Sequence, residues 1–180
     1  WAIWPSSLLV VCGALVIGYL LLSARWPALL VPKRDAFIFW SLVTVGILFR
    51  VRAFLESRSL WTDEVFLADN LRSRNILEVL SNPLDHGQSA PPAFLLLVWS
   101  CHKLLGSSEI SLRAIPFMFG IAAVIAAKFV ATRVFSHPLS QGVFIGFVSF
   151  SPVLIYYSQE LKPYSIDVFA AVLAIWMMGK

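Results

Sequence analysis

Long runs of apolar residues constrain this chain more than any other feature of its sequence. Residues 36–55 and 110–134 are such runs, and each is long enough as a helix to cross a bilayer core about 30 Å thick. Of all residues, 59% are hydrophobic and only 13% are charged, whereas soluble domains are about 25% charged. The sequence therefore predicts an all-α polytopic membrane protein.

About five segments are predicted to span the membrane: residues 6–24, 36–55, 110–134, 139–157 and 164–180. We interpret the chain as the N-terminal part of one transmembrane domain. Basic residues in the loop 25–35 place that loop in the cytoplasm by the positive-inside rule. Because the chain begins with Trp and ends within an apolar run, we expect a fragment of a longer protein.

Residues 56–109 are expected to form an external segment of short helices beside the membrane. The pair Asn75 and Glu78 predicts a capping box for one of these helices. Residues 91–105 are apolar but reach only about 22 Å as a helix, so we expect them to return to the same face. The apolar face of the first short helix is expected to contain Val65, Phe66, Ala68 and Leu71.

Two adjacent carboxylates, Asp63 and Glu64, follow the second predicted span. In one interpretation Thr62 caps a helix whose first turn carries both acids, which the helix dipole favours. In the other, the acids belong to a catalytic site, because a carboxylate near lipid is costly without a role. If residues 91–105 do not cross the membrane, Glu160 emerges on the same face as Asp63 and can join that site.

The net charge of +4 is modest and is spread over the loops. It favours anionic lipid headgroups or phosphates as partners and does not indicate nucleic acid. Cys12 and Cys101 lack metal-ligand spacing and do not indicate a disulfide, and His86 has no second ligand nearby in the sequence. No metal and no other cofactor is therefore expected.

Four short motifs follow one another within residues 36–175. They are SLWTDE at residues 59–64, QSAPP at 88–92, LGSSEISLR at 105–113 and IYYSQELKPYSID at 155–167. In this order they resemble the N-terminal half of the C-type glycosyltransferase superfamily. The branch they resemble contains bacterial relatives of dolichyl-phosphate-mannose protein mannosyltransferases and of lipid A aminoarabinose transferases.

The resemblance implies inverting transfer of a sugar from a polyprenyl-phosphate donor to a lipid, glycan or protein acceptor. It implies a site on the extracytoplasmic face of the bacterial inner membrane. Asp63 would be the general base, with Glu64 beside it, and Glu160 or Asp167 would supply a second acid. The chain departs from the mannosyltransferase pattern in the fourth motif, where Ser-Arg is replaced by Ser158-Gln159-Glu160. The first span, residues 6–24, is an addition to the family pattern.

In such a reaction the leaving phosphate is already charged and needs cations or hydrogen-bond donors rather than a strong acid. The residues expected to bind the substrate are Arg58, Gln88, Arg113, Lys162 and Tyr164.

Two alternatives remain open from the sequence. The chain could belong to a transporter or flippase of lipid-linked substrates, although its acids lie at span ends and no internal repeat is visible. It could also be a membrane scaffold without catalysis, in which the acids only cap helices.

Overall fold

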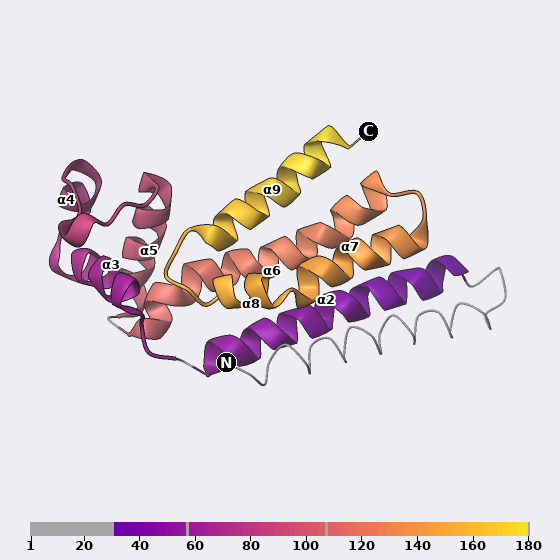
Figure 1. Ribbon diagram of the computed structural model, residues 1–180, viewed down its shortest axis with the longest axis horizontal. Coiled ribbons are helices and arrows are strands. Elements are labelled where there is room, and N and C mark those ends of the chain that lie inside the picture. Colours follow the sequence, from indigo (N-terminus) through magenta and orange to yellow (C-terminus); the bar gives the residue numbers. More distant parts are fainter. Residues whose placement is uncertain (1–30, 57, 107, 180) are drawn as a thin grey trace.

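The computed structural model describes residues 31–56, 58–106 and 108–179, with side chains from residue 33 onward. Within these ranges every regular element is a helix (Figure 1). The predicted span 6–24 lies outside the described residues. The helices are α2 (Val31–Leu55), α3 (Thr62–Ser73), α4 (Ile76–Ser81), the short 3₁₀ helix η2 (Asp85–Gly87), α5 (Pro92–Leu105), α6 (Glu109–Val134), α7 (Pro138–Phe150), α8 (Pro152–Tyr157) and α9 (Tyr164–Met178).

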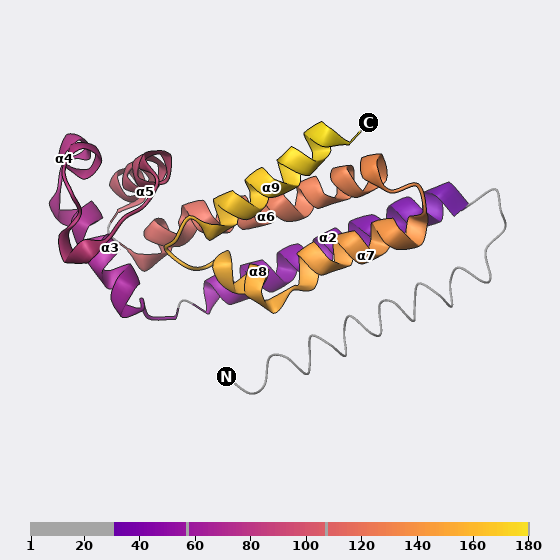
Figure 2. The same ribbon diagram turned by 45° about the horizontal axis from the view of Figure 1, so that its top comes forward.

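Four helices, α2, α6, α7 and α9, form a lengthwise bundle (Figures 1 and 2). Two segments, Lys33–Leu55 and Glu109–Val134, are long and apolar enough to cross a membrane, in agreement with two of the predicted spans. Buried apolar side chains join α2, α6 and α7 of this bundle, because each of these helices covers an apolar stripe of its neighbour. Among them are Phe39 and Val43 of α2, Val124 and Ala127 of α6, and Ile145 of α7.

The predicted span over residues 139–157 is not one continuous helix. Pro152 has no N–H to continue the helical ladder, and it keeps the preceding residue out of the α region. Ser151 accordingly adopts φ −56° and ψ 120°, so α7 ends at Phe150 and α8 starts at Pro152. The last predicted span, 164–180, is represented by α9, which has 15 residues and is shorter than a full crossing of about 20 residues. Five spans are therefore not confirmed.

The helices α3, α4 and α5 gather at one end of the bundle around a second apolar core (Figure 1). The predicted apolar face of α3 is partly wrong, because Leu67 is buried whereas Val65 is exposed. The face that packs inward instead carries Glu64, Leu67, Ala68 and Leu71, with the i, i+3, i+4, i+7 spacing of one helix face. The predicted capping box of α4 is confirmed, since Asn75 and Glu78 each accept the other's backbone N–H.

The chain leaves this end along α6 and returns to it along α7 and α8, before α9 runs away again (Figure 2). The helix α5 has 14 residues and packs against α3, α4 and the beginning of α6. It stays at the same end of the bundle. The segments around residues 60 and 160 are thereby brought together.

Candidate functional site

A pocket of about 450 Å³ opens at this end of the bundle. Four of the predicted site residues line it: Asp63, Glu64, Glu160 and Lys162. The first turn of α3 provides one wall, and the end of α8 with the following turn provides the other. Its lining residues are Trp61, Thr62, Asp63, Glu64, Tyr156, Glu160 and Lys162. The predicted common location of Asp63 and Glu160 therefore agrees with the structure.

Glu64 is fully buried and holds the two walls together. Its Oε1 accepts the backbone N–H of Leu161 at 2.6 Å, and its Oε2 accepts the backbone N–H of Trp61 at 2.9 Å. Arg113 donates Nη2–H to the same Oε2 at 3.0 Å. Both carboxylate oxygens are thus engaged by the protein, as a buried charge requires. Glu64 has the geometry of an anchor between α3, α6 and the turn after α8.

The predicted capping of α3 by Thr62 is wrong. Thr62 is the first helical residue, Trp61 occupies the N-cap position, and no side chain at the N-cap forms a capping hydrogen bond. The Glu64 side chain reaches back to the Trp61 N–H and satisfies one of the donors that a helix start leaves open. Because Glu64 is buried, water does not compete for its Oε2, which accepts the Trp61 N–H.

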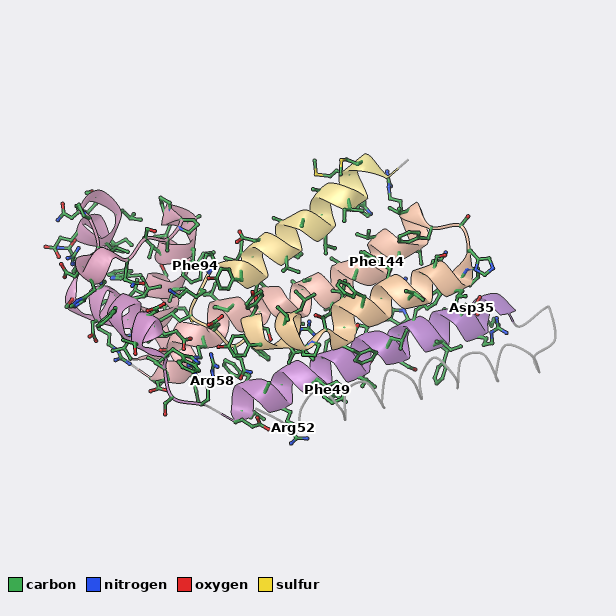
Figure 3. The ribbon with its side chains drawn as sticks, viewed as in Figure 1. Asp35, Phe49, Arg52, Arg58, Phe94 and Phe144 are labelled. Atoms are coloured by element: carbon green, nitrogen blue, oxygen red, sulfur yellow. The ribbon has the colours of Figure 1, made fainter. Side chains whose placement is uncertain are left out.

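Two arginines surround Glu64. Arg113 is buried, and besides Glu64 it donates to the backbone carbonyls of Arg58 and Ser59. Arg58 lies where α3 meets the bundle (Figure 3), with its Nη2 3.7 Å from Glu64 Oε2 and its guanidinium 4.3 Å from the centre of the Tyr156 ring. Arg113 is therefore used inside the protein, whereas Arg58 lies directly behind the aromatic wall of the pocket.

Asp63 differs from Glu64 in its exposure and in its contacts. It is exposed, lines the pocket and forms no hydrogen bond or ion pair with any residue that the structure describes. It occupies the second position of α3, where the dipole of the helix stabilises a negative charge. An accessible carboxylate without a protein partner has the properties that a general base needs.

Glu160 faces Asp63's helix from the turn after α8, and its Oε2 is buried without a hydrogen-bond partner among the described residues. Burial raises the pKa of the Glu160 carboxyl above its usual value, and the nearby charge of Glu64 raises it further. Arg58, Tyr156 and Lys162 act on that pKa in the opposite direction. The pocket thus combines the exposed carboxylate of Asp63 with the carboxyl group of Glu160, whose pKa is raised above the ordinary value for glutamate.

The remaining predicted residues lie outside the pocket lining. Gln88 follows η2 and donates its backbone N–H to Asp85, and Tyr164 packs on Tyr157 with ring centres 4.6 Å apart at the start of α9. Asp167, the alternative second acid, is exposed in the first turn of α9. Of the two alternatives, only Glu160 lines the pocket with Asp63. Within the described parts of the chain, no group of three His, Cys, Asp or Glu side chains could hold a metal ion.

Sequence reasoning missed the two aromatic walls. Trp61 is half exposed at the pocket, and Tyr156 lines the pocket with the Arg58 guanidinium stacked over its ring. Both belong to the motifs quoted above, so their positions were available from the sequence. Aromatic residues are also common at membrane interfaces, so the sequence favoured an interfacial role for Trp61 and Tyr156 over a role in lining a pocket. Flat aromatic faces beside acids and a lysine suit a polar ligand with apolar C–H faces.

The residues that the structure describes form an all-helical unit with two membrane-length apolar helices, and a pocket with acidic and aromatic side chains lies at one end of the bundle. Comparison with protein-family models, with curated proteins and with solved structures finds no significant match to this chain.

Proposed function

We propose that this chain is part of a membrane glycosyltransferase that uses a polyprenyl-phosphate sugar as donor. Transfer is inverting, and Asp63 is the general base that removes the proton of the acceptor as it attacks the anomeric carbon. The acceptor is a lipid, a glycan or a protein, and the reaction takes place on the extracytoplasmic face of the bacterial plasma membrane.

The observation that carries this proposal is the pocket that Asp63, Glu160 and Lys162 share beside the aromatic rings of Trp61 and Tyr156. Its volume of about 450 Å³ lies within the range of small-molecule sites, roughly 300–1,000 Å³. A pocket at the end of an apolar bundle suits a donor whose tail stays in lipid while its head reaches water. Lys162 supplies a cation for the leaving phosphate, with Arg58 behind the Tyr156 ring.

Asp63→Asn in the full-length protein tests the proposal directly. General-base catalysis typically contributes about 10²- to 10⁴-fold, so transfer from a polyprenyl-phosphate sugar is expected to fall at least about 100-fold. Unfolding temperature in detergent should remain that of the wild type, because Asp63 is exposed and has no partner among the described residues.

Asp69→Asn is the matched control, since Asp69 is also an exposed acid on α3 and does not line the pocket. This control should transfer sugar at the wild-type rate. Normal transfer by Asp63→Asn would remove Asp63 as the base, and equal losses in both variants would point to the charge of α3 rather than to one residue.

Transport of a lipid-linked substrate is a second candidate, favoured by the break between α7 and α8. Transporters commonly build substrate sites from interrupted helices. Reconstituted protein that moved a lipid-linked sugar across vesicles without covalent turnover would support this candidate over transfer.

A further inference from the structure

The end of α7 has backbone carbonyls that the helix itself cannot satisfy. In a continuous helix the carbonyl of Val148 would accept the N–H of residue 152, and Pro152 has none. The last carbonyls of any helix also lack partners within the helix. Buried carbonyls without donors are costly, so the break between α7 and α8 needs donors from elsewhere.

Arg50 of α2 supplies these donors. Its Nη2 donates to the carbonyl of Val148 at 2.9 Å, and its Nη1 donates to the carbonyl of Ser149 at 2.8 Å. Arg50 is 1% exposed and forms no ion pair with any residue in the described ranges. The negative end of the α7 dipole therefore takes the place of a carboxylate partner, because C-terminal carbonyls attract a cation.

Gly46 allows this contact to form. It lies one turn before Arg50 on the same face of α2, and its carbonyl accepts a further N–H from Arg50 at 3.1 Å. A Cβ on Gly46 would lie 2.7 Å from the Cβ of Ser149. Only glycine lets α2 approach the end of α7 this closely without displacing it.

The helix that starts at the break leads directly to the pocket. Tyr156, on α8, lines the pocket and stacks against Arg58, and Glu160 follows in the next turn. The direction in which α8 leaves the break therefore determines where the second wall of the pocket stands relative to Asp63. None of these contacts involves a ligand.

We propose that Arg50 is a positioning residue for the pocket: its guanidinium fixes the break at Pro152 and thereby holds Tyr156 and Glu160 opposite Asp63. Arg50 does not touch the pocket. Its effect on sugar transfer rests on the function proposed above, whereas its effect on the geometry of the pocket does not.

The test measures how fast a cysteine at position 160 reacts with a water-soluble maleimide, in full-length protein in detergent with Cys12 and Cys101 replaced by serine. Arg50→Met should raise this rate roughly tenfold, because the end of α7, from which α8 departs, loses two hydrogen bonds from a charged donor. In a Pro152→Ala background, Arg50→Met should change the rate far less, because alanine, unlike proline, has a backbone N–H that it can donate to the Val148 carbonyl. Equal effects of Arg50→Met in the two backgrounds, or no effect in either, would overturn the proposal.

Two further measurements keep the result interpretable. A cysteine at Ser81, exposed at the end of α4, should react at the same rate in all variants, which excludes general unfolding. If Arg50→Met does not fold, Arg50→Lys retains a donor, and its rate should lie above that of the wild type only where Pro152 is present.

Sugar transfer by the same Arg50 variants, with Glu160 intact, separates the two proposals. Transfer is expected to fall with Arg50→Met and to recover partly with Arg50→Lys. If the labelling rates follow the expected pattern but the wild-type protein transfers no sugar, the proposed function is wrong and the positioning role of Arg50 stands.

Discussion

Two neighbouring acids in this chain have opposite environments. Asp63 is open to the pocket, whereas Glu64 is buried and bonded through both oxygens to Leu161, Trp61 and Arg113. The sequence placed both as candidates because adjacency in a motif says nothing about which side chain turns inward. Helical geometry separates them, since successive residues on a helix point about 100° apart. These environments favour Asp63 as the candidate general base and Glu64 as a structural residue.

Glu64→Gln tests this division at the scale of one residue. Removing one charge of a buried ion pair leaves Arg113 without its partner, and such changes cost about 3–5 kcal/mol. We expect a clear fall in the unfolding temperature of the protein in detergent, measured by thermal unfolding. Glu78→Gln, an exposed acid in the capping box of α4, is the control and should leave that temperature almost unchanged.

The same pair of variants can contradict the assignment. If Glu64→Gln kept the wild-type unfolding temperature while abolishing transfer, Glu64 would act in the reaction and not as an anchor.

How well the sequence predicts a site residue depends on how far apart in the sequence its contacts lie. The sequence predicts Asp63 and Glu160 on one face from the number of membrane crossings, which follows from apolar run lengths and from the positive-inside rule. The burial of Glu64 depends on Arg113 and on the backbone of Leu161, 49 and 97 residues away in the sequence. No local pattern specifies such contacts. The sequence likewise predicts Arg113 as a substrate-binding residue, because its long-range contacts leave no local pattern. In the structure Arg113 is buried and donates to Glu64 and to the backbone carbonyls of Arg58 and Ser59.

At the scale of helices, a glycine on α6 permits the close approach of the turn that carries Glu160. Gly120 of α6 faces Ser158, and a Cβ on Gly120 would overlap the Cβ of Ser158. Ser158 is fully buried at the C-cap of α8, where its hydroxyl donates to the Ile155 carbonyl. The contact between α6 and α8 is therefore backbone-close and cannot accommodate a larger residue without moving the turn.

Gly120→Ala is expected to destabilise the protein by about 1–3 kcal/mol through overpacking, more than the roughly 0.5–1 kcal/mol that alanine gains over glycine within a helix. Thermal unfolding measures this change, and transfer should fall with it because Glu160 moves. In Gly146→Ala, the nearest atom to the new Cβ would be Phe150 Cδ2 at 4.0 Å, so this control should be neutral or slightly stabilising. If Gly120→Ala were as stable as this control, Ser158 could move away from the new Cβ at little cost, and the predicted overpacking would be wrong.

Helix positions followed from the sequence where apolar runs were uninterrupted, as in α2 and α6. The break at Pro152 was missed because proline is tolerated in membrane helices when neighbouring groups satisfy the freed carbonyls. Here the bonds of Arg50 to Val148 and Ser149 stabilise a full interruption. Hydropathy alone cannot detect such a break, since the residues on both sides of it are equally apolar.

For the whole molecule, the distribution of charge matches its two ends. All acidic residues except Asp35 lie toward the pocket end of the molecule. They are Glu56 after α2, Asp63, Glu64 and Asp69 on α3, Glu78 on α4, Asp85 in η2, Glu109 at the start of α6, Glu160 after α8 and Asp167 in the first turn of α9. Lys33 and Arg133 lie at the opposite end, which Asp35 marks in Figure 3. An apolar bundle with polar groups at both ends is the arrangement expected of a membrane protein.

Cysteine labelling of intact cells tests the orientation. With Cys12 and Cys101 replaced, single cysteines at positions 63 and 160 should react with a membrane-impermeant reagent from outside, because both line one pocket. A cysteine at position 133 should react only after permeabilisation, since it lies at the other end of α6. Labelling of 63 and 160 from opposite sides would contradict the helix arrangement, and external labelling of 133 alone would reverse the orientation.

The bond between Glu64 and the Leu161 backbone also implies an order of events during synthesis. Domains generally form in the direction in which the chain is made, from the N-terminus onward. Glu64 is synthesised 97 residues before Leu161, and until Leu161 has been made the Glu64 Oε1 lacks the donor that it has in the folded protein. The pocket is thus completed only when the turn after α8 arrives, so a chain arrested before residue 161 holds every acid of α3 but no site.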